Sequence, residues 1–333
     1  MNEDSRTESV RSLVQSIGLE GRSLLSIDDL PNEQIYDLFG LADVLEPWRR
    51  SAAPLCVGSV MSTLFFQPST RTRMSFETAM HRLGGSVISE ADPMVTSAAA
   101  KEESLSDMLR VVSQYANIIV LRHPDDVEAR EAIRLSTSPV INGGLGHWEH
   151  PTQALLDLYT LWHVYGRIEG LSVCIASPDL VEARTGHSMA QGLARLGAKV
   201  TLASTSARRT PAAVIESMQA TGADVEESLD DTQESFNELI RGMHLVYLPG
   251  SSAPKGPDAE RFKTLMDQYL VRYETLEMVR RDEDRTIYVT HTLPRRAGEM
   301  DLRIDGSPNQ LYFEAIGYSV SLRMALVAAI LAA

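Results

Sequence analysis

The chain contains only two cysteines, Cys56 and Cys174, among its 333 residues. Each lies inside an apolar run, PLCVGSVM or LSVCIAS, and no Cys-x-x-Cys pair or cysteine–histidine cluster occurs. A disulfide framework and a structural zinc site therefore have no support, because both need several such ligands at short spacings. We expect two buried, reduced thiols, and we predict no bound metal and no cofactor.

Positive charge is also scarce. The chain has 31 lysines and arginines against 45 aspartates and glutamates, which gives a formal net charge of −14. A protein this acidic is poorly suited to binding nucleic acid, because that binding depends on neutralising many phosphates. Any site for an anion must concentrate its positive charge locally.

Apolar segments that could direct the chain to a membrane are few. The N-terminal stretch MNEDSRTESVRS is polar and has no apolar signal core. The most apolar late segment, SVSLRMALVAAILAA, contains Arg323 and is too short to span a bilayer. The sequence therefore predicts a cytoplasmic protein with no membrane partner and no nucleic-acid partner.

Two common nucleotide-binding signatures are missing. No GxxxxGK[ST] occurs, and no GxGxxG follows any predicted strand, which argues against a P-loop protein and a dinucleotide-dependent dehydrogenase. No carboxylate pair and no serine–histidine–aspartate array stands out either. A site without a nucleophile would work by positioning its substrates and by stabilising charge.

What the chain does contain is a regular alternation of strand-like and helix-like segments. Apolar runs such as LCVGSVMSTLFF and ANIIVLRHP alternate with helical patterns, and the alternation restarts after a long helix near residue 150. This pattern predicts an α/β fold with two domains, each a parallel sheet flanked by helices, with a cleft between them. We expect the first dozen residues to form a loose tail and ligands to bind at the carboxyl ends of the strands.

The most unusual stretch is FFQPSTRTRMSFETAM, residues 65–80, in which an apolar strand runs into a helix. Ser69 and Thr70 stand at the expected helix start, where free N–H groups carry positive partial charge. With Arg71, they would complete a phosphate cradle. The alternative is a well-capped helix with solvated arginines.

Other candidate residues follow predicted strands. Arg122 ends the strand IIVLRHP, and His150 and Gln153 share one face at the start of the helix HPTQALLDL. The ordinary alternatives are a strand leaving the core and a helix cap. Further candidates are Lys101 in SAAAKEESLSD, Arg184 in SPDLVEARTGHS, and His291, Leu293, Pro294 and Arg295 in THTLPRRAGEMD.

The segments FFQPSTRTRMSFETAMHRLGG, LRHP, HPTQALLDL and HTLPR resemble, in order and spacing, the aspartate/ornithine carbamoyltransferase family. They are most similar to the catalytic chains of aspartate carbamoyltransferases, over nearly the whole chain. The resemblance implies a carbamoyl-phosphate-binding domain over residues 1–152, completed by a C-terminal helix at about 317–333 that packs back on it. Residues 153–316 would form the domain for the second substrate, an amine or amino acid.

The resemblance also implies roles for individual residues. The residues that would bind carbamoyl phosphate are Ser69, Thr70, Arg71, Thr72, Ser97, Lys101, Arg122, His150, Gln153, Leu293 and Pro294. The segment from Ser69 to Thr72 would hold the phosphate, and Arg122 would bridge the phosphate and the carbonyl oxygen. Thr72 and His150 would polarise that carbonyl, so the predicted catalytic residues are Thr72, Arg122 and His150.

The carbamoyl NH₂ would be held by the side chain of Gln153 and the backbone carbonyls of Leu293 and Pro294. Ser97 and Lys101 fall where the family lends a loop to the neighbouring subunit, which implies a homotrimer with shared active sites. An amine would attack the carbonyl carbon, and phosphate would leave.

The second-substrate site departs from the family pattern. Arg184 matches the arginine that binds the α-carboxylate, but Gly250-Ser251-Ser252 stands where aspartate-using members carry Arg-x-Gln. Lys255, Arg295 or Arg296 could compensate for the missing arginine. The ornithine-type Ser-Met-Gly pattern is also absent, and Tyr318 replaces a usual asparagine.

The predicted second-substrate residues are therefore Arg184, Gly250, Ser252, Lys255 and Arg295. We predict carbamoyl transfer to a carboxylate-bearing amine other than plain aspartate, such as a diamino acid or an amine of specialised metabolism. The alternatives are an aspartate carbamoyltransferase with an altered aspartate pocket and a catalytically silent relative acting as a scaffold subunit.

Overall fold

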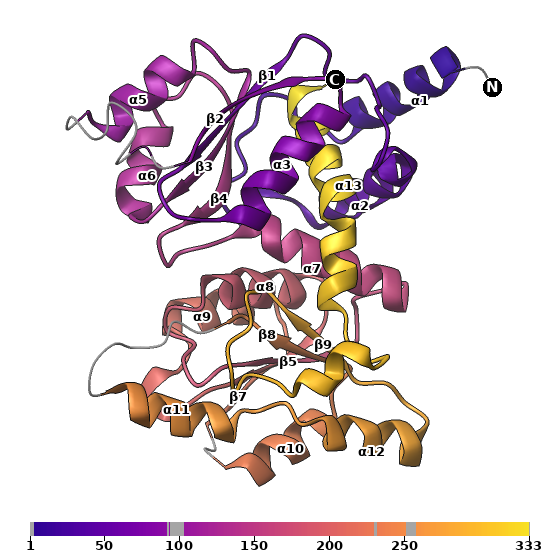
Figure 1. The fold of residues 1–333 in the computed structure, drawn as a ribbon, viewed down its shortest axis with the longest axis vertical. Coiled ribbons are helices and arrows are strands. Elements are labelled where there is room, and N and C mark those ends of the chain that lie inside the picture. The colour runs from indigo at the N-terminus through magenta and orange to yellow at the C-terminus, as the bar shows by residue number, and fades with distance from the viewer. Residues whose placement is uncertain (1–2, 92, 94–102, 230–231, 251–257, 333) are drawn as a thin grey trace. The chain divides into compact units, whose positions relative to one another are not determined.

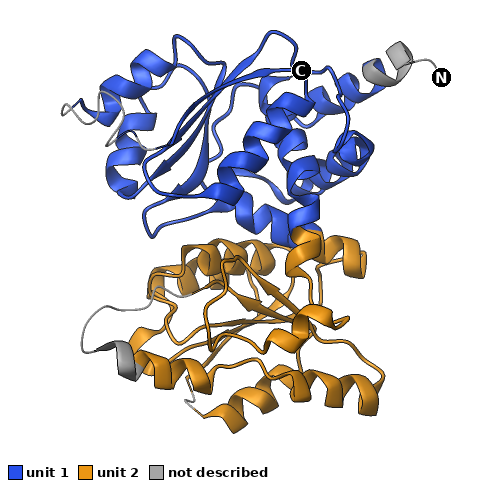
Figure 2. Cartoon of the chain, viewed as in Figure 1, with its two compact units in different colours: residues 1–159, 316–333 blue, residues 160–315 orange. Residues whose placement is uncertain are grey.

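The computed structural model describes residues 3–91, 93, 103–229, 232–250 and 258–332. The chain forms two compact units, one of residues 1–159 and 316–333 and the other of residues 160–315 (Figure 2). The chain passes from the first unit to the second inside helix α7 (Pro151–Tyr165) and returns inside helix α13 (Tyr312–Leu331).

Unit 1 is built on a four-stranded sheet in which every pair of neighbours is parallel. Its order is β2-β1-β3-β4, and the strands are β1 (Val60–Phe65), β2 (Ser86–Glu90), β3 (Ile118–His123) and β4 (Val140–Leu145). Helices α5 (Leu105–Val112) and α6 (Asp126–Ile133) lie on one side of the sheet, and α3 (Thr70–Arg82) and α13 lie on the other (Figure 1). The carboxyl ends of all four strands therefore meet at one edge.

The βα unit that opens the sheet follows from its sequence. Strand β1 is mostly apolar, and its central residues are buried, Ser62 and Thr63 included. Helix α3 buries Phe76 and Met80, which are four residues apart on one face. It ends at Arg82 and is followed closely by Gly84, whose φ of +81° is a left-handed conformation that glycine adopts without a steric cost.

Unit 2 repeats the design with a five-stranded parallel sheet of order β7-β6-β5-β8-β9. Its strands are β5 (Ser172–Ala176), β6 (Lys199–Ala203), β7 (Val225–Ser228), β8 (Leu245–Leu248) and β9 (Tyr288–His291). Its helices are α8 (Arg184–Arg195), α9 (Ala212–Ala220), α10 (Gln233–Arg241), α11 (Asp258–Gln268) and α12 (Tyr273–Glu283). The predicted fold class, parallel sheets flanked by helices, is confirmed.

Two expectations about the ends of the chain need correction. The first residues form helix α1 (Glu3–Ser16) and not a loose tail. Its residues Val10 and Val14 are buried, four residues apart on one face, and this face is what the polar composition of the segment concealed. Helix α2 (Asn32–Leu45) follows.

The C-terminal helix is also longer than predicted. It begins at Tyr312 rather than near Gly317, so α13 has 20 residues and is long and apolar enough to cross a membrane. About 67% of its apolar stretch is buried inside the protein, as in the core helix of a globular domain. It packs on unit 1, as predicted: the rings of Tyr318 and Tyr159 lie 5.4 Å apart, and Arg49 donates a hydrogen bond to the Gly317 carbonyl.

The two cysteines are free and buried, which confirms the expected reduced thiols. Burial raises the pKa of the Cys56 thiol to about 12 and the pKa of the Cys174 thiol to about 12. Both side chains therefore behave as small apolar core residues rather than as reactive groups.

Candidate active site

The start of α3 carries the predicted phosphate-binding residues. Ser69 is the N-cap residue, and its hydroxyl makes no capping hydrogen bond to the first turn. The Ser69 side chain thus does not compete for the first turn, and the start of a helix is suited to an anion. Thr70 and Arg71 are exposed, whereas Thr72 is buried. Partial burial lowers the pKa of Arg71 below its ordinary value.

The two arginines of this helix differ in their surroundings. The Arg73 guanidinium donates a hydrogen bond to the Ser89 hydroxyl at 3.1 Å and lies 3.7 Å from the Glu77 carboxylate. Glu77 also accepts hydrogen bonds from Ser89 and Thr63. Arg73 is therefore part of a polar cluster with the edge strand β2, and Arg71 is the arginine that the prediction assigns to phosphate.

Arg122 lies directly beside this helix start. It pairs in register with Phe65 at the carboxyl end of β1, and its carbonyl accepts a hydrogen bond from the N–H of Phe66. Its guanidinium Nη1 donates to the Gly143 carbonyl of β4 at 3.0 Å. Because neighbouring parallel strands end together, Arg122 comes from β3 to the same edge as the first turn of α3.

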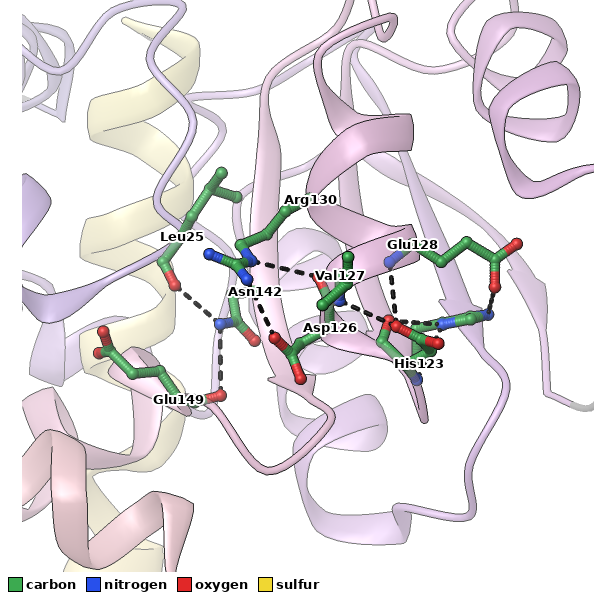
Figure 3. A network of polar contacts seen from close by, with 9 residues as sticks. Leu25, His123, Asp126, Val127, Glu128, Arg130, Asn142 and Glu149 are labelled. Carbon is green, nitrogen blue, oxygen red and sulfur yellow. Dashed lines mark hydrogen bonds and ion pairs between the residues drawn. The ribbon is translucent and has the colours of Figure 1, made fainter. Parts of the chain in front are cut away.

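The loop that follows β3 is held by its own polar contacts (Figure 3). The Asp125 carboxylate accepts hydrogen bonds from the N–H groups of Val127 and Glu128 and so caps α6. The His123 ring accepts from the N–H of Asp125 and lies 3.8 Å from the Glu128 carboxylate. These contacts fix the chain immediately after Arg122.

His150 reaches Thr72 from the opposite side of the site. Its ring Nε2 lies 3.5 Å from the Thr72 hydroxyl, and Nδ1 lies 3.4 Å from the hydroxyl of Thr152. Only 4% of His150 and 6% of Thr72 are exposed. Two of the three predicted catalytic residues thus meet at the edge of the unit 1 sheet.

The residue before His150 anchors this loop. The buried Glu149 carboxylate accepts hydrogen bonds from the Ser26 hydroxyl at 2.6 Å and the Ile27 N–H at 3.1 Å. The amide of Asn142 donates to the carbonyls of Leu25 and Glu149 (Figure 3). The N-terminal segment therefore supports the loop that carries His150.

Gln153 lies one turn further along α7. Its side-chain nitrogen Nε2 is 3.1 Å from both carboxylate oxygens of Asp157. Sequence reasoning missed Asp157, although its spacing of four residues from Gln153 on a predicted helix was a usable signal.

In unit 2, the segment after β9 has an unusual backbone. Leu293 has a φ of +53°, and the Leu293–Pro294 peptide bond is cis. The N–H of Leu293 donates to His291 Nδ1 at 2.7 Å, so Nε2 carries the ring hydrogen and donates to Glu299 at 2.9 Å. Glu299 also accepts from the N–H of Arg296, and this buried pair holds the turn in shape.

The turn after β8 is held by hydrogen bonds to Pro249. The hydroxyls of Thr185 and Thr292 both donate to the Pro249 carbonyl, at 3.2 Å and 2.7 Å. The next residue, Gly250, has a φ of +72°. A cavity of about 10 Å³, lined among others by Gly250 and Glu299, lies at the carboxyl ends of β5 and β8.

The remaining second-substrate residues lie in several places. Arg184 is the first residue of α8, and burial lowers its pKa. Arg295 forms an ion pair with Asp305 and lies over the ring of Tyr312, so an acceptor carboxylate would compete with Asp305 for it. The predicted residues Ser97, Lys101, Ser252 and Lys255 lie outside the described residues.

Within unit 1, Ser69 to Thr72 and Arg122 follow the carboxyl ends of β1 and β3, His150 lies against Thr72, and Gln153 lies in the first turn of α7. Leu293 and Pro294 belong to unit 2, as do Arg184 and Gly250. Glu149, Asp157 and Glu299 are supporting carboxylates that sequence reasoning did not find.

Two family models match the chain. The model of the aspartate/ornithine carbamoyltransferase carbamoyl-P binding domain matches residues 22–163, and that of the Asp/Orn binding domain matches residues 169–330. The chain is 67% identical to a ureidoglycine carbamoyltransferase from Rubrobacter xylanophilus over 98% of this chain and 96% of that protein. It is 39% identical to the aspartate carbamoyltransferase catalytic subunit of Methanopyrus kandleri, over 93% of this chain and 97% of the relative.

Solved structures agree with these matches. The Trypanosoma cruzi aspartate transcarbamoylase in complex with carbamoyl aspartate and phosphate has a TM-score of 0.84 at 29% identity, covering 94% of this chain and 97% of that one. The catalytic subunit of M. jannaschii aspartate transcarbamoylase has a TM-score of 0.79 at 35% identity, covering 92% and 96%. The chain therefore belongs to the aspartate/ornithine carbamoyltransferase family and is a carbamoyltransferase.

Proposed function

We propose that this enzyme carbamoylates the amine of ureidoglycine, using carbamoyl phosphate as the donor. Ureidoglycine carries a carboxylate, an amine and a neutral ureido group on one carbon. Transfer of the carbamoyl group to its amine gives a second ureido group and inorganic phosphate. This acceptor satisfies the prediction of a carboxylate-bearing amine other than plain aspartate.

The donor half of the proposal is supported by the edge of the unit 1 sheet. The start of α3 offers N–H groups, hydroxyls and Arg71 to a phosphate, and Arg122 is held beside it by the Gly143 carbonyl. We assign the phosphate to the segment from Ser69 to Thr72 and the carbamoyl NH₂ to Gln153 and the carbonyls of Leu293 and Pro294.

The proposed reaction needs no protein nucleophile. The acceptor amine attacks the carbonyl carbon of carbamoyl phosphate, and the carbonyl oxygen becomes an oxyanion. Thr72, Arg122 and His150 stabilise this oxyanion by donating hydrogen bonds to it. The oxyanion then collapses, the C–O bond to phosphate breaks, and the proton lost by the amine nitrogen passes to a phosphate oxygen. Phosphate leaves with its charge held at the start of α3 and by Arg71. Preorganised donors of this kind each contribute roughly 10²–10³-fold to a rate.

The acceptor half rests on one observation above all, which is the turn at Gly250. Aspartate-using relatives are expected to place the arginine of Arg-x-Gln here, and this chain has a glycine with a φ of +72°. The side-chain carboxylate of aspartate would lose its charged partner, at roughly 1.5–3 kcal/mol per hydrogen bond to a charged group. A neutral ureido group needs no such partner. The identity of 67% to a ureidoglycine carbamoyltransferase supports the same acceptor.

We further propose that the enzyme is a homotrimer in the cytoplasm, in which Ser97 and Lys101 complete the site of a neighbouring subunit. Arg184 would bind the acceptor α-carboxylate, because a partly desolvated guanidinium is stabilised by an anion. Two free buried thiols are compatible with a reducing compartment.

The acceptor proposal is tested by measuring phosphate release from carbamoyl phosphate with a panel of amines. The panel contains freshly prepared ureidoglycine, aspartate, ornithine and 2,3-diaminopropionate. We expect kcat/KM for ureidoglycine to exceed that for every other amine by at least about a hundredfold, a difference of about 2.7 kcal/mol. Efficient turnover of aspartate would refute the proposed acceptor but leave carbamoyl transfer intact.

A further inference from the structure

We propose that Asp157 is a positioning residue that fixes the side-chain amide of Gln153 with its oxygen toward the carbamoyl group. By this orientation it makes the site select carbamoyl phosphate over acetyl phosphate, which has a methyl group in place of the NH₂. The inference rests on the proposed role of Gln153 in holding that NH₂. The inference adds to that role a reason why Gln153 presents the oxygen of its amide, and not the NH₂, to the substrate.

The orientation follows from the contact between Gln153 and Asp157. The two residues are four apart on α7, so their side chains lie on one face of the helix. Gln153 Nε2 is 3.1 Å from both oxygens of Asp157. An ionised carboxylate has only acceptors, so the NH₂ of the amide must face it. The oxygen of Gln153 then points to the other side, where it can accept a hydrogen bond.

A buried positive charge, that of Arg323, belongs to the same unit as Asp157. Asp157 is 3% exposed on α7, and Arg323 of α13 is also 3% exposed. The Arg323 guanidinium lies 5.0 Å over the ring of Phe76 and donates to the Ser319 carbonyl at 3.3 Å. Burial lowers the pKa of Arg323 to about 10, and the charge of Asp157 acts against this shift. Because opposite charges buried in one core stabilise each other, Arg323 offers Asp157 a partner charge.

The consequence concerns which donor molecules can bind. An amide turned the other way would point its NH₂ at the NH₂ of carbamoyl phosphate, and two donors cannot form a hydrogen bond. A site that accepts hydrogen bonds from a substrate NH₂ disfavours an analogue that lacks it, because the buried acceptor is left unpaired. The ratio of affinities for carbamoyl and acetyl phosphate therefore reports the orientation of Gln153.

The experiment measures KM for carbamoyl phosphate and the inhibition constant of acetyl phosphate in the full-length protein. In Asp157→Asn the amide of Gln153 is free to turn, because asparagine offers both a donor and an acceptor. We expect kcat/KM for carbamoyl phosphate to fall at least tenfold while the acetyl phosphate constant changes less than threefold. Gln153→Ala should lose the same discrimination between carbamoyl and acetyl phosphate. Adding Asp157→Asn to Gln153→Ala should lower kcat/KM for carbamoyl phosphate only slightly further.

Three further variants keep the test decisive. Arg323→Lys retains a charge and should keep much of the discrimination. The double variant Asp157→Asn with Arg323→Met removes both buried charges, so it should fold and still fail to discriminate. Asp43→Asn is the matched control, because Asp43 of α2 accepts a hydrogen bond from Tyr159 of α7, the helix of Gln153, at 2.6 Å. It should leave the ratio unchanged.

Equal weakening of carbamoyl and acetyl phosphate in Asp157→Asn would overturn the inference, because that result describes general loosening of α7. An unchanged ratio in the folded double variant would overturn it as well. Failure of the proposed function gives a different result, since the wild-type protein would then release no phosphate from carbamoyl phosphate with any amine.

Discussion

The donor site in unit 1 and the acceptor turn in unit 2 both lie at the carboxyl ends of parallel strands. They differ in the contacts that hold their residues in place. In unit 1, two side chains that would touch the donor are supported by a second residue, Gln153 by Asp157 and Arg122 by the Gly143 carbonyl. In unit 2, the turn at Gly250 is held through the backbone, by two threonine hydroxyls on the Pro249 carbonyl. A fixed set of side chains suits a constant donor, whereas a backbone turn with little side chain leaves room for a different acceptor.

The largest effect should come from the donor site. Arg71→Ala is expected to lower kcat/KM by roughly 10³-fold, the upper range for losing one preorganised donor to a developing charge. Carbamoyl phosphate binding, measured by isothermal titration, should become undetectable while the melting temperature stays unchanged. Arg73→Ala is the matched control, because Arg73 is occupied by Glu77 and Ser89. Equal losses in the two variants would remove the distinction between these arginines.

His150→Ala should have the next largest effect, and on a different parameter. We expect kcat to fall roughly 10²-fold, because the donor to the oxyanion is lost, while carbamoyl phosphate still binds through α3. Steady-state kinetics and titration of the same protein separate the two quantities. A variant with normal kcat and a raised KM would show that His150 acts in ground-state binding.

An acceptor-site substitution should leave donor binding intact. Arg184→Gln is expected to raise the acceptor KM by roughly 10–100-fold, which corresponds to a lost hydrogen bond from a charged group. The affinity for carbamoyl phosphate should change by less than twofold. If both substrates weaken together, Arg184 does not belong to the acceptor site alone.

The smallest kinetic effect is expected from exchanging Gly250 and Ser252 for the residues of the aspartate-using pattern. The family pattern alone predicts that Gly250→Arg with Ser252→Gln creates or raises aspartate use. The structure limits this gain, because a non-glycine residue in the left-handed region costs roughly 1–2 kcal/mol. We expect aspartate kcat/KM to rise by less than tenfold. A rise of a hundredfold would show that the side chain alone, and not the backbone turn, excludes aspartate.

The buried thiols in the cores of the two units should be equally unreactive. Cys56 in unit 1 and Cys174 in unit 2 each have a pKa raised to about 12 by burial, so at pH 8 both stay protonated and unreactive. Iodoacetamide should label neither thiol in the native protein and both after denaturation, as read by intact mass. Labelling of one thiol in the native state would identify a unit that opens locally.

The sequence was sufficient for the architecture because strands such as β3 and β5 are mostly apolar and amphipathic helices lie between the strands. The sequence was less informative where a mostly polar segment forms a helix with a narrow apolar face. The N-terminal segment is mostly polar, but Val10 and Val14 bury one face of α1. At the end of the chain, Arg323 was read only as a charge that excludes a membrane span, whereas it belongs to the core of unit 1.

The sequence also predicted only part of the candidate site. Residues that follow strands, such as Arg122 and His150, could be predicted from their position, because parallel strands bring their carboxyl ends to one edge. The residues behind them could not, because a buried carboxylate such as Glu149 contacts a segment 122 or 123 residues away. The left-handed turn at Gly250 is a backbone property that a glycine permits but does not require.

The account is tested most directly by a competition between two acceptors. The enzyme is given carbamoyl phosphate with equal concentrations of ureidoglycine and aspartate, and both carbamoylated products are quantified by mass spectrometry. We predict that the diureido product exceeds carbamoyl aspartate by at least about a hundredfold. Equal amounts, or an excess of carbamoyl aspartate, would contradict the central claim that the turn at Gly250 has changed the acceptor.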